Sequence, residues 1–197
     1  LEAGLRPTVL EAGDRPVGSW PHYYDSLTLF SPVRFNTFCG ERFPGVPEGY
    51  PARDEVVGFL HRFADGLDAE IRTGVRVTAV EPDGAAFMVR TESGEALHAS
   101  AVIAASGSFG NPYVPVLPGA ETFTGEARHV AEYRSPDRFA GRRVVIVGGG
   151  NSAVQVGYEL ARVASTTLAT RRPLQFWAQN VGGKDIHHRL VESGFED

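Results

Sequence analysis

The chain has 197 residues, of which 42% are hydrophobic and 22% are charged, and its formal net charge is −5. These values are typical of a globular α/β protein that is long enough to bury a core in one or two domains. The negative charge argues against nucleic acid or an anionic membrane as a partner, and no apolar run approaches the roughly 20 residues of a membrane helix.

The first predicted element is an apolar strand at residues 8–12, which ends near the acidic Glu11. Residues 1–7 before it are typical of the end of a helix, with Gly4 as the C-cap. A helix is predicted within residues 50–68, because an apolar face follows the polar start at Arg53 or Asp54.

Residues 71–100 are predicted to form short antiparallel strands, with turns at Asp83-Gly84 and Ser93-Gly94. Residues 102–107 are predicted as a buried strand that closes on a small-residue turn. Proline and glycine then cluster, and the apolar periodicity lapses before the next strand-like run. The sequence therefore predicts a first domain at residues 1–111, a linker at 112–141 and a second domain at 142–197.

The second domain opens with a dinucleotide fingerprint. A β-branched apolar run at 144–147 leads into G-x-G-x-x-A, and a helix-patterned segment follows. In this fingerprint Gly148 makes the tight turn, Gly150 admits a pyrophosphate close to the backbone, and Ala153 keeps the helix near the strand. The pyrophosphate is expected on the free N–H groups at the helix start. The predicted contact residues are Gly148, Gly150, Asn151, Ser152 and Ala153.

A second strand at residues 166–170 is followed directly by Arg171 and Arg172. An NAD site places an acidic side chain about 20 residues after the glycines, whereas an NADP site places an arginine there for the 2′-phosphate. No Asp or Glu lies between Ser165 and Gln179. The sequence therefore favours NADP, with the two arginines as ligands of the phosphate.

Directly upstream, Phe123, Gly125, His129 and Tyr133 match the pattern F-x-G-x-x-x-H-x-x-x-Y. This pattern resembles the identifying motif of the flavin-containing monooxygenases, which belong to the superfamily of pyridine nucleotide–disulfide oxidoreductases. The resemblance implies an α/β fold with two Rossmann-like domains, one for FAD and one for NADP. In the family the motif lies between these two domains, where it serves cofactor binding, and we assign no proton transfer to His129.

Other segments extend the resemblance over nearly the whole chain. Glu11 resembles the residue that holds the adenosine ribose of FAD, and residues 18–20 resemble the G-G-x-W segment beside the flavin. Residues 104–107 resemble the family's A-T-G motif, with serine in place of threonine. The FAD contacts that the resemblance implies are Glu11, Arg15, Gly18, Ser19, Trp20, Ser106 and Gly107.

Members of this superfamily begin with a strand and a glycine loop for FAD, about 30 residues before the acidic residue. Here Glu11 stands near the start of the chain. We therefore interpret the sequence as an internal fragment in which both nucleotide domains are incomplete. Residues 1–111 are then part of the FAD domain, 112–141 the linker with the family motif, and 142–197 part of the NADP domain.

Three functional classes remain open: a flavin monooxygenase that oxidises a small soft nucleophile, a thioredoxin-reductase-like flavoprotein, and a non-catalytic nucleotide-binding fragment. The second lacks a redox centre, because no cysteine lies between Phe109 and Asp197. The first is weakened at one position, since Phe30 stands where the family commonly has an asparagine near the flavin, and the nearest one is Asn36. The substrate is expected to be a small molecule of unknown structure, and the oligomeric state stays open.

The single cysteine, Cys39, excludes an internal disulfide and is consistent with a reducing, cytoplasmic compartment. His187 and His188 are adjacent, but no carboxylate or thiol at ligand spacing accompanies them. A metal site is therefore not expected.

Overall fold

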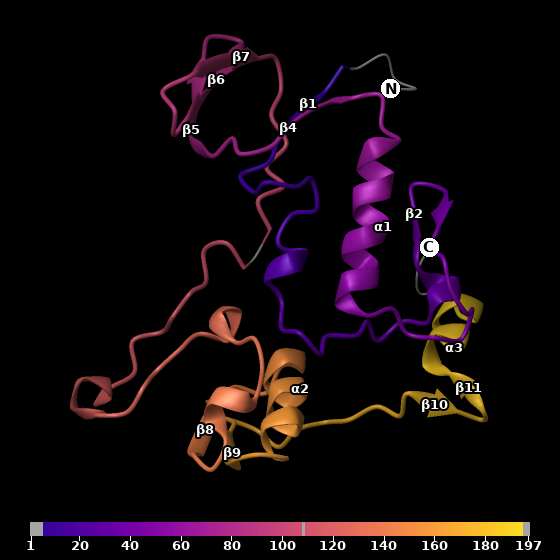
Figure 1. Ribbon diagram of the computed structural model, residues 1–197, viewed down its shortest axis with the longest axis vertical. Helices are drawn as coiled ribbons and strands as arrows, with labels where there is room; N and C mark the ends of the chain where they lie inside the picture. Colours follow the sequence, from indigo (N-terminus) through magenta and orange to yellow (C-terminus); the bar gives the residue numbers. More distant parts are fainter. Residues whose placement is uncertain (1–5, 108, 195–197) are drawn as a thin grey trace.

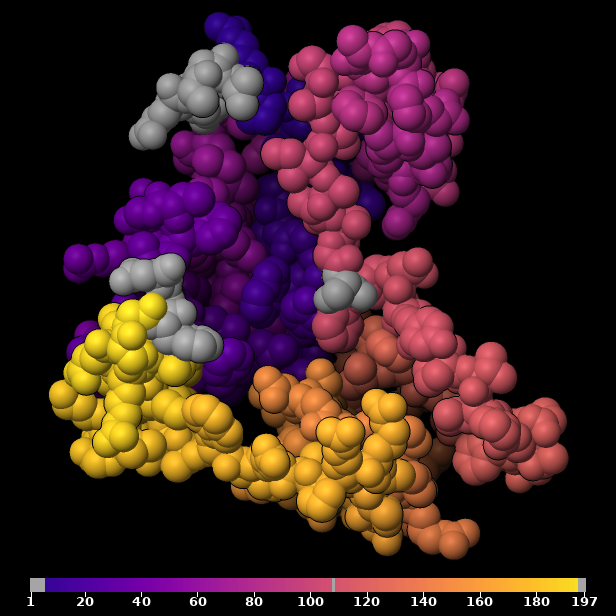
Figure 2. Space-filling model, turned by 180° about the vertical axis from the view of Figure 1, so that it is seen from behind, coloured from indigo at the N-terminus to yellow at the C-terminus, as the bar shows by residue number. Residues whose placement is uncertain are grey.

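The computed structural model describes residues 6–107 and 109–194, so the expected helix C-cap at Gly4 lies outside the described residues. Two α/β units share the chain, and a long linker joins them (Figure 1). The linker projects from the body of the molecule, and the C-terminal helix returns to the N-terminal half (Figures 1 and 2). No helix among the described residues is long and apolar enough to cross a membrane.

The N-terminal unit is built on a parallel pair of strands, β1 (Thr8–Leu10) and β4 (Glu70–Arg72), in which Val9 lies opposite Ile71. The prediction that residues 71–100 form only antiparallel strands is wrong at this point. The helix α1 (Arg53–Asp65) lies between β1 and β4 along the chain. A strand that is reached again through a helical crossover joins its partner in parallel, which is the βαβ arrangement.

The helix α1 begins where the sequence predicts. Glu55 in its first turn accepts a hydrogen bond from the Ala52 N–H at 2.8 Å, which satisfies one donor of the helix start. Its apolar face buries Val56 and Phe59, which pack with Phe43 from the segment before the helix. The partly buried residues around this cluster are Trp20, Leu29, Val33 and Leu60. This core fixes the N-terminal segment that carries Trp20.

The predicted antiparallel strands after β4 are confirmed as β5 (Val77–Asp83), β6 (Ala86–Thr91) and β7 (Ala96–Ala99). Both predicted turns contain a glycine with positive φ, +62° at Gly84 and +87° at Gly94, a conformation that glycine adopts without steric cost. A smaller hairpin precedes α1 and consists of β2 (Thr37–Phe38) and β3 (Glu41–Arg42).

The predicted buried strand at residues 102–107 is wrong, because these residues are irregular and exposed. Ile103 is 90% exposed. None of the described strands pairs with this segment. An isolated strand has unpaired backbone N–H and C=O groups, so an apolar β-branched sequence alone is not sufficient to form one.

The second unit consists of β8 (Arg143–Val147), α2 (Asn151–Leu160) and β9 (Ser165–Ala169), close to the predicted bounds. The two strands are parallel, with Val145 opposite Thr167. Val156 and Leu160 of α2 form a core with Tyr133 from the linker. The chain then forms the hairpin β10 (Asn180–Val181) and β11 (Lys184–Asp185), which leads into α3 (Ile186–Glu192).

Short 3₁₀ helices connect the main elements: η1 (Trp20–His22), η2 (Val33–Phe35), η3 (Ala120–Thr122), η4 (Val130–Glu132) and η5 (Asp137–Phe139).

Candidate functional site

The glycine turn between β8 and α2 leaves the backbone at the start of the helix uncovered. Gly148 has a φ of +126°, which favours glycine, and Gly150 is the N-cap of α2. A Cβ at Gly150 would meet no atom within 4 Å. The backbone is therefore open to a ligand at the helix start, where the N–H groups of the first turn lack intrahelical partners.

The close approach between α2 and the strands lies at a residue that sequence reasoning missed. A Cβ on Gly157 would come within 2.8 Å of Leu168 Cδ1 and 3.3 Å of Ile146 Cδ1. Gly157 therefore lies where the helix packs closely on β8 and β9, one turn after Ala153. Ala153 itself is only half-buried. The signal in the sequence was a glycine inside a helical pattern, which indicates tight packing because glycine otherwise destabilises a helix.

The arginines predicted to bind a 2′-phosphate lie beside the glycine turn. Arg171 and Arg172 are exposed and line an open hollow of about 900 Å³ together with Gly149. The Thr170 hydroxyl donates to the Arg172 carbonyl at 2.9 Å, which holds the turn after β9. The other lining residues are Thr170, Pro173, Leu174 and Gln175. The hollow thus extends from the two arginines to the glycine turn.

The first half of the linker motif is a local fold of Phe123 over Gly125. A Cβ on Gly125 would collide with the Phe123 ring, so the ring occupies the space of a side chain there. Phe123 itself is 63% exposed. The spacing F-x-G therefore has a steric reason, which is the absence of a side chain at the second position.

The second half of the motif is anchored through its histidine and tyrosine. His129 Nδ1 accepts a hydrogen bond from the Ala131 N–H at 3.1 Å and so caps η4. Tyr133 is buried, and its hydroxyl donates to Glu159 Oε2 of α2 at 2.8 Å. Burial and this carboxylate raise the pKa of Tyr133 above its ordinary value. The motif thereby ties the linker to the helix that follows the glycine turn.

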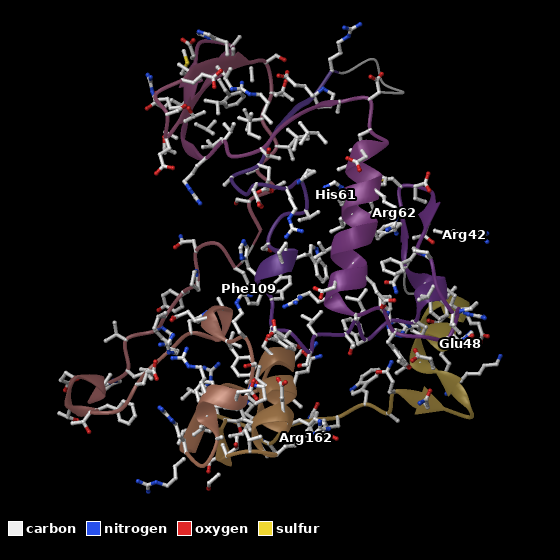
Figure 3. All side chains as sticks on the ribbon, in the orientation of Figure 1. Arg42, Glu48, His61, Arg62, Phe109 and Arg162 are labelled. Atoms are coloured by element: carbon white, nitrogen blue, oxygen red, sulfur yellow. The ribbon has the colours of Figure 1, made fainter. Side chains whose placement is uncertain are left out.

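A smaller aromatic pocket of about 240 Å³ lies between the two units. Trp20 and Phe30 reach it from the N-terminal unit, while Asn151 and Ser152 reach it from the start of α2. Figure 3 shows Phe109 near η1 on the same side, and its ring lies 4.8 Å from that of Tyr23. The remaining lining residues are His22, Tyr23, Tyr24, Leu27, Thr28, Leu29, Val130, Ala131, Tyr133 and Gln155.

One hydrogen bond closes this pocket across the two units. The Tyr24 hydroxyl donates to Gln155 Oε1 of α2 at 2.5 Å. Burial, together with the charge of Glu159, raises the pKa of Tyr24 above its ordinary value.

The residues implied as FAD contacts are distributed unevenly around these cavities. Trp20 lines the aromatic pocket, and the Ser19 hydroxyl next to it donates to the Tyr23 hydroxyl at 3.2 Å. Glu11 follows β1, and its Oε1 accepts from the Gly13 N–H at 2.7 Å. Arg15 is exposed and lies 3.8 Å from Asp14. The implied contacts outside both cavities are Glu11, Arg15, Gly18, Ser19, Ser106 and Gly107.

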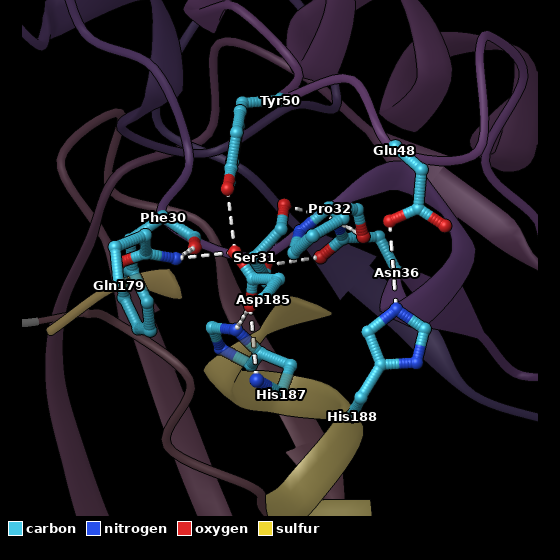
Figure 4. A network of polar contacts seen from close by, with 10 residues as sticks. All are labelled: Phe30, Ser31, Pro32, Asn36, Glu48, Tyr50, Gln179, Asp185, His187 and His188. Carbon is cyan, nitrogen blue, oxygen red and sulfur yellow. Dashed lines mark hydrogen bonds and ion pairs between the residues drawn. The ribbon is translucent and has the colours of Figure 1, made fainter. Parts of the chain in front are cut away.

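A polar cluster around the buried Asp185 and His187 joins the C-terminal segment to the N-terminal unit, and sequence reasoning missed it (Figure 4). Asp185 Oδ2 accepts from the Tyr50 hydroxyl at 2.5 Å and from Gln179 Nε2 at 2.7 Å. Asp185 Oδ1 lies 2.9 Å from the His187 backbone N and 2.6 Å from His187 Nδ1. Burial opposes the charge of Asp185, but the hydrogen bonds from Tyr50, His187 and Gln179 outweigh it and lower its pKa. Only an aspartate before the C-terminal helix pattern hinted at this cluster.

No group of three or more His, Cys, Asp or Glu that could hold a metal ion occurs within the parts of the chain that the structure describes.

The parallel strand pairs, the glycine turn and the arginine-lined hollow define an α/β protein of the dinucleotide-binding class. Residues 2–186 match the family model described as pyridine nucleotide-disulphide oxidoreductase. The chain belongs to this family.

Similar proteins include monooxygenases. The indole-3-pyruvate monooxygenase YUCCA1 of Oryza sativa subsp. japonica is 37% identical over 162 residues, which are 81% of this chain and 40% of that protein. The solved flavin-containing monooxygenase of Stenotrophomonas maltophilia is 37% identical, with a TM-score of 0.87 over 96% of this chain and 56% of that one. The chain thus spans about half the length of these relatives.

A further solved structure, the OTEMO complex with FAD and NADP, is 25% identical with a TM-score of 0.67, and covers 87% of this chain and 35% of that one. These likenesses confirm the expected fold class, α/β with Rossmann-like domains.

Proposed function

We propose that the whole protein is an FAD-dependent, NADPH-using monooxygenase that oxygenates a small soft nucleophile such as an amine or a sulfide. One observation carries this proposal: the arginine-lined hollow and the aromatic pocket both border the start of α2, through Gly149 and through Asn151 and Ser152. A single extended dinucleotide that crosses the helix N-terminus would reach both cavities.

The residues present fit NADP. The open backbone at Gly150 and the free N–H groups of α2 suit a pyrophosphate. Arg171, and with it Arg172, would pair with the 2′-phosphate, because a guanidinium presents several donors in a fixed plane. When bound, NADPH supplies a hydride and FAD supplies the oxygen chemistry.

The residues present also fit part of an FAD site. The carboxylate of Glu11 stands at the end of a parallel strand, which is where this class of fold binds a ribose. Trp20 lies in the aromatic pocket and contributes an apolar wall that excludes water from the reacting centre. The proposed FAD contacts are Glu11, Arg15, Gly18, Ser19, Trp20, Ser106 and Gly107.

The domain division follows the same logic. Residues 1–111 belong to the FAD domain and 142–197 to the NADP domain, while the motif of 112–141 holds α2 against the N-terminal unit. Tyr133 carries this role through Glu159, and Tyr24 adds a bond to Gln155. The linker residues Phe123, Gly125 and His129 are proposed as cofactor-binding residues on the family resemblance alone, since none of them lines either cavity. A cytoplasmic location accords with the single cysteine.

The alternative, a thioredoxin-reductase-like flavoprotein, is less favoured. No cysteine lies between Phe109 and Asp197, so residues 142–197 contain no disulfide centre. The resemblance to a solved bacillithiol disulfide reductase, at 23% identity and a TM-score of 0.74, concerns the fold alone.

The proposal is tested on the flavin-loaded, full-length gene product. We expect NADPH to bleach the flavin spectrum without oxygen, and we expect methyl phenyl sulfide with oxygen to yield sulfoxide in step with NADPH consumption. Oxygen uptake that gives only hydrogen peroxide with a panel of amines and sulfides would refute the oxygenase assignment. Failure of NADPH to reduce the flavin would refute the nucleotide assignment as well.

A further inference from the structure

The cluster around Asp185 fixes more than the C-terminal hairpin, because one of its members bonds to the wall of the aromatic pocket. Gln179 Nε2 donates to the Phe30 carbonyl at 2.8 Å and to Asp185 Oδ2 at 2.7 Å (Figure 4). A side-chain amide carries two N–H donors, so both bonds are satisfied by one group. Gln179 thus links residue 30 directly to residue 185.

Asp185 is a rigid anchor for this link. It is 5% exposed and accepts from Tyr50, from Gln179 and from the His187 backbone. Its Oδ1 accepts from the His187 backbone N–H and lies 2.6 Å from His187 Nδ1, so the buried carboxylate keeps its orientation when one donor to Oδ2 is removed. The position of the Gln179 amide is therefore determined by Asp185 at the end of the hairpin and by the Phe30 carbonyl of the N-terminal unit.

Phe30 is supported from the same side by a second contact. Its ring centroid lies 5.5 Å from that of the buried His187 in α3. The ring centroid of Phe35 lies 5.9 Å from the same histidine ring. Even so, Phe30 is 61% exposed while it lines the aromatic pocket. An exposed ring at a cavity rim has freedom to move unless its backbone and one face are fixed.

We propose that Gln179 is a positioning residue that fixes Phe30 at the rim of the aromatic pocket and thereby sets which substrates the pocket admits. The selectivity part of this inference rests on the proposed monooxygenase function. The positioning part does not, because it concerns only the backbone of Phe30 and its partners.

The test variant is Gln179→Leu in the full-length gene product, which keeps side-chain bulk and removes both donors. Gln179→Asn is a milder second variant, because it retains the amide but shortens the side chain by one methylene. Tyr50→Phe is the matched control within the cluster, since it removes a bond to Asp185 and leaves the Gln179–Phe30 bond in place. Lys184→Ala, at an exposed position of β11, is the surface control.

The first readout is hydrogen exchange of the peptide that covers residues 27–33. We expect Gln179→Leu to speed exchange there by about tenfold or more, and both controls to leave it within about twofold. Equal exchange in Gln179→Leu and the unmutated protein would overturn the inference. Equally faster exchange in Tyr50→Phe would also overturn it, because the effect would then be general loosening.

The second readout is the ratio of kcat/KM for methyl phenyl sulfide to that for dimethyl sulfide. We expect Gln179→Leu to change this ratio by about fivefold or more and Gln179→Asn to change it less in the same direction, while Tyr50→Phe keeps it within about twofold. An unchanged ratio in Gln179→Leu would overturn the selectivity role. If the unmutated protein oxidises neither sulfide, the proposed function fails, and the exchange measurement still decides whether Gln179 positions Phe30.

Discussion

Removal of the Tyr133 hydroxyl is expected to loosen the linker motif from α2. Tyr133 is 7% exposed, its hydroxyl donates to Glu159 at 2.8 Å, and its ring packs with Val156 and Leu160. Tyr133→Phe keeps the ring and its contacts and removes only the hydrogen bond. A hydrogen bond to a charged group contributes roughly 1.5–3 kcal/mol. Because Glu159 is half-buried and water can replace the hydroxyl, we expect the lower end, about 1.5 kcal/mol.

This loss of stability is measurable by thermal unfolding. For a unit of 150–250 residues, about 1.5 kcal/mol lowers the Tm by roughly 3–6 °C. The matched control is Tyr158→Phe on the same helix, where the tyrosine is 69% exposed, and a change within about 0.5 kcal/mol is expected. A Tm of Tyr133→Phe that equals the Tm of the unmutated protein would refute the role of this bond.

The difference in free energy of unfolding between the unmutated protein and Tyr133→Phe is expected to depend on pH. Burial and Glu159 raise the pKa of Tyr133, so the folded state retains the proton longer than the unfolded state does. The stability from this group is complete below the pKa of an unfolded tyrosine, about 10, and decreases as the pH rises above it. The gap in free energy of unfolding between the unmutated protein and Tyr133→Phe should therefore be constant from pH 6 to 9 and narrow above about pH 10. A gap that widens at high pH would contradict this reasoning.

Three further predictions concern the cofactor sites and the packing of α2. In stopped-flow flavin reduction, Arg171→Ala should raise the KM for NADPH several-fold and leave the KM for NADH nearly unchanged, whereas the control Arg42→Ala should change neither. Equal use of NADH and NADPH by the unmutated protein would exclude the phosphate site. Glu11→Ala should lower flavin occupancy after dialysis more than Glu11→Gln, which keeps an acceptor for the Gly13 N–H; unchanged occupancy in both would contradict ribose binding. Gly157→Val should lower the free energy of unfolding in urea by about 1–3 kcal/mol, because the new side chain would collide with β9, and Gly58→Val in α1 should lower it less. An equal decrease in the two variants would refute the packing argument.

The unit of β8, α2 and β9 was predictable because its signals are local. A β-branched run, a glycine turn and an apolar helical face lie next to one another in the sequence, and each requirement acts within a few residues. The same holds for α1 and for the turns at Gly84 and Gly94, where backbone geometry demands glycine. Arg171 and Arg172 could be assigned to a 2′-phosphate because they follow the second strand directly, and this assignment stays a prediction.

What the sequence could not decide depends on partners distant along the chain. Residues 102–107 have the composition of a buried strand, yet a strand forms only where another strand receives its hydrogen bonds, and none of the described strands does. The strand β4, which contains Ile71, is parallel to β1 because the chain crosses over through α1, and the periodicity of the sequence does not encode this crossover.

The Asp185 cluster is the clearest tertiary outcome. It joins Tyr50, Phe30 and Gln179, which no sequence spacing relates, since a buried carboxylate is stable only where folding brings donors to it. By itself the sequence determined β8, the glycine turn, α2 and β9. The tertiary structure alone decided which side chains surround the aromatic pocket, because its walls come from both units and meet only after α2 packs on Tyr133.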